Sequence, residues 1–375
     1  MALRSRVLLA AAVVVPLALA TACGGGGNAI VPLAATSQSG SIPSGPAPGP
    51  QSISENGSSL LYPLMQEWAG AYHQQHPNVT ISTGKLGSKL GIAKAAAGTV
   101  DIGASDAYLP SAILVQHPTL LNIPLAISAQ QVNYNVPGLR PNVHLKLSPK
   151  VLVGMYDGTI KTWNNPLIHA LNPGVPLPNT PVVPVHRLDG SGDTFLFTSY
   201  LSTEFSAWSR TYGYGTTVAW PHGVPLARTA TGNSGMLAEC QQVKGCVAYI
   251  GIAYLTQATQ AGLGYAQLQN KAKNWELPSA TAIAAAVTPF VSTTPANETI
   301  SMVNGPASNG YPIVNYEYAI VSTLQPNAAK ARDVKAFLHW AITQGNLAQY
   351  LNKVQFQHLP PPIASLSDAQ IAKIG

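Results

Sequence analysis

Charged side chains are scarce in this sequence. Asp, Glu, Lys and Arg make up only 9% of its 375 residues, against about 25% in an average soluble domain. There is no basic run and no stretch in which basic and aromatic residues alternate, which argues against a nucleic-acid partner. The net charge is +6; Arg4 and Arg6 lie in a segment that we expect to be removed, so the mature chain is nearer +4.

Motifs of common enzyme classes are also missing. The nine histidines are scattered, with no His-x-His or His-Glu-x-x-His pattern of the kind that binds a metal. A nucleophile elbow has glycine two residues to either side of its serine, whereas Ser191 has Asp189 and Asp193 there. The only Gly-Lys pair, Gly84-Lys85, is followed by leucine, so there is no P-loop. We expect no enzyme, no cofactor and no metal.

The first 50 residues have the pattern of an exported, membrane-anchored protein. Residues 1–22 combine a short basic head, an apolar core and small residues, as in a secretory signal peptide. The residues around Cys23 resemble a bacterial lipobox, whose cysteine is lipidated; ordinary signal cleavage that leaves a free thiol is the alternative. Residues 23–50 then read as the lipidated cysteine and a flexible Gly/Ser/Pro linker. We expect export across the cytoplasmic membrane and a lipid anchor at its outer face.

The chain has three cysteines, and two remain after Cys23 is assigned to the lipid. Cys240 and Cys246 are six residues apart, and in an oxidising compartment they predict a small-loop disulfide. A metal site is the alternative, but it would need two more ligands nearby. The nearest histidine, His222, is eighteen residues before Cys240.

Apolar residues recur with strand and helix spacing in alternation, which predicts an α/β protein with mainly parallel sheets in two lobes. No internal repeat is present. The predicted strands are 79–81, 100–104, 125–134, 182–185, 247–252 and 313–321. The predicted helices are 60–73, 90–97, 150–158, 163–171, 195–208 and 328–344.

The segment HRLDGSG at 186–192 combines features of an anion site. It follows a predicted strand and precedes a predicted helix, and helix N-termini offer unpaired amide groups and a partial positive charge. Its two glycines let the backbone curve around a small ion, and Arg187 can donate a two-pronged hydrogen bond. Asp189 is placed to hold and neutralise Arg187. A simple helix cap with a surface salt bridge is the alternative.

The same chemistry occurs twice more upstream, and a carboxylate adds a fourth element. Gly/Ser turns at 56–60 and 84–88 each precede a predicted helix. Asp106 follows a strand end, where ligands of open α/β sheets bind. We expect these elements to converge on one oxyanion, since three such turns would be a coincidence if they were only caps.

These motifs resemble the phosphate-binding proteins (PstS family) of the high-affinity Pst-type phosphate ABC transporter. The resemblance runs from about Ser54 to the end and rests on GSSLLYPL, TVDIGASDAYL, IKTWNNPLIHALNPG, HRLDGSGDTFLFTSYL, GCVAYIG and YPIVNYEYAIV. It implies a two-lobed periplasmic-binding-protein (Venus-flytrap) fold with two hinge crossover strands. We place lobe I at 51–133 plus 316–375 and lobe II at 134–315.

The resemblance also implies which residues bind phosphate. Carried over position by position, they are Ser59, Leu60, Ser88, Asp106, Arg187, Asp189, Ser191, Gly192 and Asp193.

The chain departs from the family pattern at three places. Ser59-Leu60 stands where many members have Thr-Phe, which keeps the hydroxyl and the amide. Asp193 stands where many have Thr, so we carry over only its amide and expect its carboxylate to cap the helix. Lys85 and Lys89 flank Ser88 and could face either the cleft or solvent.

The resemblance implies a monomeric binding protein that delivers inorganic phosphate to ABC permease subunits. Phosphate near neutral pH carries a proton that Asp106 could accept, whereas sulfate does not. The first alternative is a phosphate-ester hydrolase, with His186 as the one candidate base, although a structural role suits this histidine better. Another tetrahedral oxyanion as ligand, or a surface antigen or adhesin with a vestigial site, are the remaining alternatives.

Overall fold

The computed structural model describes residues 42–375. The predicted signal peptide, Cys23 and most of the linker lie outside these residues. The strands are β1 Gln51–Gly57, β2 Val79–Ser82, β3 Ile102–Ser105, β4 Leu120–Asn135, β5 Lys146–Leu147, β6 Val183–Arg187, β7 Arg228–Ala230, β8 Cys246–Gly251, β9 Gly264–Tyr265, β10 Gln267–Gln269, β11 Trp275–Glu276 and β12 Val314–Ser322. Within the described range, no helix is both long and apolar enough to cross a membrane.

The helices vary in length from one turn to four. They are α1 Tyr62–Gln75, α2 Ser88–Ala96, α3 Ser111–Gln116, α4 Pro149–Tyr156, α5 Pro166–Leu171, α6 Gly192–Glu204, α7 Ser206–Thr211, α8 Gly232–Gln242, α9 Leu255–Gln260, α10 Ala280–Val287, α11 Ala328–Ile342, α12 Ala348–Leu351 and α13 Pro361–Ile371. Short 3₁₀ turns occupy Ile252–Tyr254, Thr288–Phe290, Gln344–Asn346 and Asn352–Val354.

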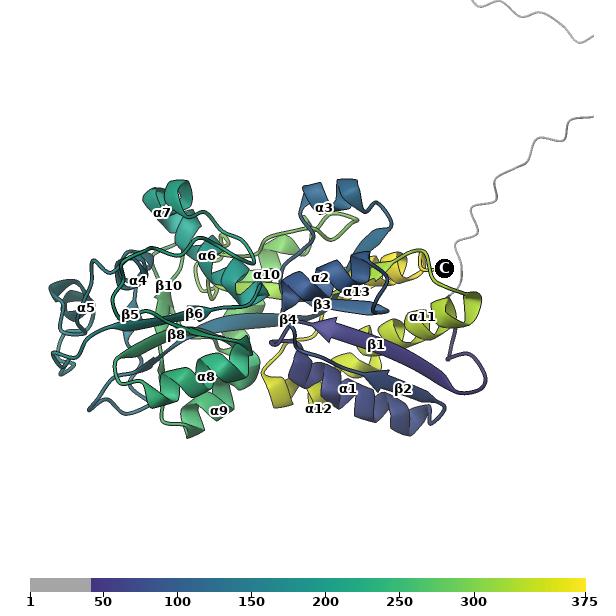
Figure 1. The fold of residues 1–375 in the computed structure, drawn as a ribbon, viewed down its shortest axis with the longest axis horizontal. Coiled ribbons are helices and arrows are strands. Elements are labelled where there is room, and N and C mark those ends of the chain that lie inside the picture. The colour runs from purple at the N-terminus through teal and green to yellow at the C-terminus, as the bar shows by residue number, and fades with distance from the viewer. Residues whose placement is uncertain (1–41) are drawn as a thin grey trace, which may run out of the picture. The chain divides into compact units, whose positions relative to one another are not determined.

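One mixed sheet runs through the structure in the order β2-β1-β3-β12-β4-β8-β6-β7, with β9 also paired to β4. Its outer pairs are parallel and its central pairs, around β12 and β4, are antiparallel. Figure 1 shows α2 and α6 on one face of this sheet and α1 and α8 on the other. The predicted α/β class is confirmed, and the two halves share one continuous sheet.

The long strand β4 joins the two halves. Its residues up to Ala129 pair with β12, and from Gln130 onward they pair with β8. Fifteen of its sixteen residues are buried, so the strand needs cover on both faces and reads as a long, mainly apolar run. At the point where β4 changes partner from β12 to β8, the Gln130 amide donates to Ile313 O over 3.0 Å. The segment that leads into β12 therefore lies next to β4 where the chain passes between the two halves.

The ends of two predicted helices differ from the structure for local reasons. The helix predicted over 195–208 begins earlier, at Gly192, and is interrupted at Phe205, whose extended backbone (φ −135°, ψ 95°) separates α6 from α7. The helix predicted over 163–171 begins only at Pro166, because Asn165 caps it through a hydrogen bond from the Leu167 amide. Helix α8 falls in a stretch where no helix was predicted.

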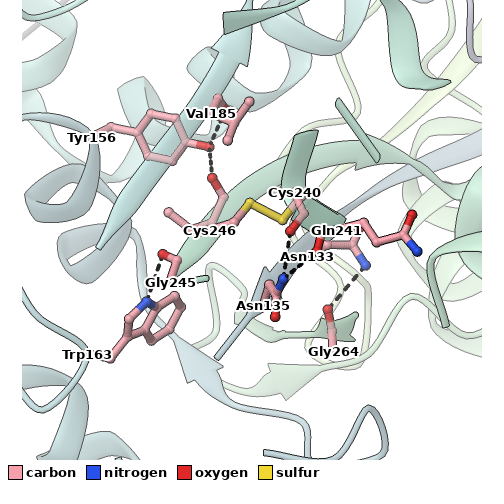
Figure 2. The surroundings of a disulfide bond; sticks show 11 residues. Asn133, Asn135, Tyr156, Trp163, Val185, Cys240, Gln241, Gly245, Cys246 and Gly264 are labelled. Carbon is pink, nitrogen blue, oxygen red and sulfur yellow. Dashed lines mark hydrogen bonds between the residues drawn. A yellow bond between two sulfur atoms is a disulfide. The ribbon is translucent and has the colours of Figure 1, made fainter. Parts of the chain in front are cut away.

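The predicted disulfide is present between the end of α8 and the start of β8 (Figure 2). Cys240 and Cys246 are fully buried. Asn135 donates to the carbonyl groups of Cys240 and Gln241 over 3.0 and 2.9 Å, and Trp163 Nε1 donates to Gly245 O over 2.9 Å. The disulfide therefore fixes the C-terminus of α8 against the sheet.

Replacing both cysteines by alanine should lower the free energy of unfolding by about 2 kcal/mol, because the unfolded chain regains the entropy of a short closed loop. Urea unfolding followed by tryptophan fluorescence measures this. The control is dithiothreitol, which should destabilise the wild type and leave the double variant unchanged. Equal stability of wild type and variant would contradict a structural role for the bond.

Candidate functional site

The predicted strand-to-helix turn at 186–192 is confirmed. Strand β6 ends at Arg187 and α6 begins at Gly192. Ser191 is the N-cap residue, and its hydroxyl accepts a hydrogen bond from the Thr194 amide. The first amides of a helix have no intrahelical partner, so the N-terminus of α6 presents donors at the end of the strand.

Arg187 is held by two carboxylates. Its Nε donates to Asp189 Oδ1 over 2.7 Å, its Nη2 contacts Asp189 Oδ2, and its Nη1 donates to Asp193 Oδ2 over 2.7 Å. Burial alone would lower the pKa of Arg187, but the hydrogen bond that Arg187 donates to Asp189 and the charge of Asp193 more than offset this effect and raise the pKa. The buried guanidinium therefore stays charged and is neutralised from two sides.

The expectation that Asp193 caps α6 is wrong, since Ser191 has that role. The Asp193 carboxylate instead turns toward Arg187 and also accepts from Asn233 Nδ2 over 2.8 Å. Gln130 Nε2 donates to the Asp193 carbonyl over 2.8 Å. Asp193 is 1% exposed, and burial raises its pKa against the opposing charge of Arg187.

The N-terminus of α8 joins the site through Asn233, a residue that the sequence analysis missed. Its amide nitrogen and its Nδ2 each donate to Ser59 Oγ over 3.0 Å, and its Oδ1 accepts from the Gly251 amide over 2.7 Å. The buried Asn233 thus connects Ser59 with Asp193. The motif Thr-Gly-Asn-Ser-Gly at 231–235 is a further Gly/Ser turn before a helix, and this signal could have revealed it.

Ser58, rather than Ser59, organises the turn before α1. Its Oγ accepts from the amides of Leu60 and Leu61 over 3.0 and 2.9 Å and contacts Asp106 Oδ1. The Leu60 amide, predicted as a phosphate donor, is therefore engaged with Ser58 in this arrangement. A hydroxyl that accepts from two amides and donates to a carboxylate fixes the position of Asp106.

The N-termini of α2 and α6 lie against each other with little space between them. The Lys89 amide donates to Gly190 O over 3.1 Å, and Ser88 Oγ accepts from the Asp106 amide over 3.2 Å. A Cβ on Gly87 would come within 2.5 Å of Gly190 O, and one on Gly192 within 2.5 Å of the Asp106 side chain. These glycines allow an approach that any side chain would block.

Asp106 and Glu317 form a second pair of acidic residues, both of them buried, in addition to the pair Asp189 and Asp193. It is 2% exposed, and burial, together with the charge of Asp193, raises its pKa to about 7. Glu317 on β12 is fully buried, and burial and the charge of Asp106 raise its pKa well above the ordinary value. Asn315 Nδ2 links the two by donating to Asp106 O over 3.2 Å and to Glu317 Oε1 over 3.0 Å.

The other residues considered in the sequence analysis, His186, Lys85 and Lys89, lie at the edge of the site. His186 stacks on Trp220 with ring centroids 4.6 Å apart, and burial lowers its pKa, as suits the structural role expected for it. Lys85 Nζ lies 5.2 Å from the ring centre of Tyr62. Lys89 has an exposed side chain beside the site. The nine predicted residues thus lie around Asp106 and Arg187, together with Ser58, Gln130, Asn233 and Glu317. That they bind phosphate stays a prediction.

Comparison with known proteins identifies the family of the chain. The PBP superfamily domain matches residues 43–344, so the chain contains a domain of this class. The phosphate-binding protein PstS of Xylella fastidiosa (strain 9a5c) is 33% identical over 317 residues, which cover 84% of either chain. The Haemophilus influenzae protein of the same name is also 33% identical and covers 85% of this chain and 92% of its own.

The chain belongs to the PstS family of phosphate-binding proteins. Among solved structures, the phosphate-binding protein of Stenotrophomonas maltophilia superposes with a TM-score of 0.63 at 19% identity, over 85% of this chain and 93% of that one. The two-lobed fold expected from the sequence is therefore confirmed.

The raised pKa of Asp106 makes stability depend on pH. Its pKa is about 7 in the folded chain and ordinarily 3.8, so between these values only the folded state holds the proton. Without phosphate, this contribution to the free energy of unfolding is complete below about pH 4 and is lost as the pH rises through about 7. Asp106→Asn cannot ionise, so its stability relative to the wild type should be greater at pH 8 than at pH 5, by on the order of 1–3 kcal/mol.

Urea unfolding of both proteins at the two pH values tests this. Asp157→Asn is the control: Asp157 bonds to Thr159 at the end of α4, away from the site. A stability difference between Asp106→Asn and the wild type that does not change with pH would contradict the assignment.

Proposed function

We propose that this chain is an extracytoplasmic solute-binding protein that captures inorganic phosphate and delivers it to the permease of a phosphate ABC importer. The observation that carries the proposal is the meeting of a buried, charged Arg187 and a buried Asp106 at the N-termini of α2 and α6. The PstS relatives support the same ligand by their names.

We propose that the oxyanion lies where the helix N-termini meet. The amides of Ser88, Gly192 and Asp193 are within the first turns of α2 and α6, where no intrahelical partner exists. The hydroxyls of Ser59, Ser88 and Ser191 and the guanidinium of Arg187 add further donors. Such fixed dipoles in a water-free site can replace the hydration shell of an anion.

The charge of the site does not by itself favour an anion. Asp189 and Asp193 both contact Arg187, so the one guanidinium is already balanced by two carboxylates. Binding would therefore depend on directed hydrogen bonds, and a more negative anion would gain nothing from the net charge. The site would therefore distinguish anions by whether they carry a proton that they can donate, rather than by their net charge.

Asp106 is the residue to which we assign that recognition. Phosphate near neutral pH still carries a proton and can donate it to an ionised Asp106, whereas sulfate would meet the carboxylate with lone pairs only. Sites that require one hydrogen bond reject an isostere that lacks it by about 10⁴–10⁵-fold. The repulsion of the wrong anion is as important here as the attraction of the right one.

We propose that lobe I, 51–133 plus 316–375, and lobe II, 134–315, close on the ligand. Strand β4 changes its pairing partner from β12 to β8 between Ala129 and Gln130. This change supports a hinge there, a few residues before the lobe boundary at 133/134 that we predicted from the sequence. The hydrogen bonds that Asn233 donates to Ser59 Oγ and that the Lys89 amide donates to Gly190 O would form on closure and be lost on opening. Closure of the lobes would signal to the permease that phosphate is bound.

The cellular setting is also a proposal. A signal peptide at 1–22 and a lipid on Cys23, followed by a linker to residue 50, would hold a monomer at the outer face of the cytoplasmic membrane. The Cys240–Cys246 disulfide supports an oxidising compartment. We assign no catalytic role: the candidate base His186 stacks on Trp220, and a hydrolase would need an activated nucleophile.

Isothermal titration calorimetry with phosphate, sulfate and arsenate tests the proposal. We expect saturable binding of one phosphate and rejection of sulfate by at least about 10⁴-fold. Asp106→Asn should narrow the gap between phosphate and sulfate, because an amide can donate to sulfate. Asp157→Asn should leave it unchanged.

Absence of phosphate binding by the wild type would overturn the function. An Asp106→Asn variant that discriminates as well as the wild type would overturn the role of Asp106 alone.

A further inference from the structure

A second recess lies beside the candidate phosphate site. Its volume is about 740 Å³, within the range of pockets that hold small organic molecules. It is lined by α2, by the segment that follows β3, and by the start of α6 with the loop at 214–216. The phosphate network does not use these side chains, so the recess needs an explanation of its own.

One wall of the recess is a row of three aromatic rings. Phe195 packs edge-on against Tyr108, with ring centroids 5.2 Å apart, and against Tyr214, with centroids 5.6 Å apart. Tyr108 belongs to proposed lobe I, whereas Phe195 and Tyr214 belong to proposed lobe II. Tyr214 remains 54% exposed, so part of this apolar surface faces solvent.

The α2 wall of the recess is made of small side chains. Ala93, Ala96 and Ala97 all line it, and their spacing of three and four residues places them on one face of α2. Ala93 and Ala97 are exposed. Small residues facing aromatic rings leave a slot whose shape suits a flat apolar group.

The ionisable residues of the recess favour an anion. Lys89 and His117 line it, and no carboxylate does. A Cβ placed on Gly190 would touch the Lys89 alkyl chain, so this chain lies over the loop that follows β6. Among the ion pairs of residues 42–375, none involves Lys89, and its ammonium group is free for a ligand.

We propose that this recess binds a small amphipathic anion, with a flat aromatic body in the slot and a carboxylate or sulfonate group near Lys89. Both proposed lobes line the recess, and Lys89, Ala107 and Phe195 stand within two residues of Ser88, Asp106 and Asp193. An occupant would therefore favour the same closed arrangement as phosphate. Binding of the two ligands would be mutually reinforcing, because linkage is reciprocal.

The coupling rests on the proposed function, whereas binding in the recess does not. The probe is 1-anilinonaphthalene-8-sulfonate, titrated by fluorescence into the mature chain with and without saturating phosphate. We expect one saturable site whose dissociation constant falls at least fivefold with phosphate. Ala93→Trp, which fills the slot, should abolish binding, and Leu90→Trp, which adds the same ring to α2 outside the recess, should retain it.

Charge is tested with Lys89→Gln and the neutral probe N-phenyl-1-naphthylamine. The wild type should bind the sulfonate several-fold more tightly than the neutral probe, and Lys89→Gln should remove this preference. Phosphate titration by calorimetry on each variant serves as the folding control.

Several results would overturn the proposal. Probe binding that is multiple and unsaturable, or that survives Ala93→Trp, would exclude the recess as the site. If Ala93→Trp and Leu90→Trp weakened probe binding equally, the recess would also be excluded as the binding site. Site-specific probe binding that phosphate leaves unchanged, in a chain that binds phosphate by calorimetry, would overturn the coupling. A chain that binds the probe but no phosphate would contradict the proposed function and leave the recess supported.

Discussion

The buried guanidinium of Arg187 is the constraint on which the rest of the site depends. A cation at 4% exposure is costly unless its charge is paired and its donors are used. Asp189 and Asp193 meet this need from the two ends of one short loop, and Asn233 and Gln130 in turn hold Asp193. The position of α6, of α8 and of the crossing strand β4 is thereby tied to a single side chain.

A second constraint is the close contact of backbones at the site. Gly87 and Gly192 leave no room for a Cβ between α2, the 188–191 loop and Asp106. This contact brings the N-terminus of α2 beside the loop that leads into α6 and places Asp106 next to both. Asp106, Arg187 and Asp193 are at most 4% exposed here, and burial strengthens the polar interactions between them. The packing and the anion recognition that we propose therefore depend on the same few residues.

The local part of the site could be predicted from the sequence, and the tertiary part could not. Glycine and serine between an apolar strand pattern and a helical pattern specify the turn before α6, and the structure has it there. The orientation of Asp193 depends on Arg187 and on Asn233, which is 40 residues away, so a rule about helix caps gave the wrong answer. Glu317 lies within a strand that reads as apolar, and only the register of β12 beside β3 and β4 shows that it is buried near Asp106.

The most direct measurement of the central claim is a high-resolution crystal structure of the chain with phosphate. The account predicts one phosphate at the N-termini of α2 and α6, with an oxygen about 2.5–2.7 Å from the Asp106 carboxylate, as in a charge-assisted hydrogen bond. It also predicts that Arg187 keeps its pairing with Asp189. A phosphate bound elsewhere, or an Asp106 carboxylate turned away from it, would contradict the account.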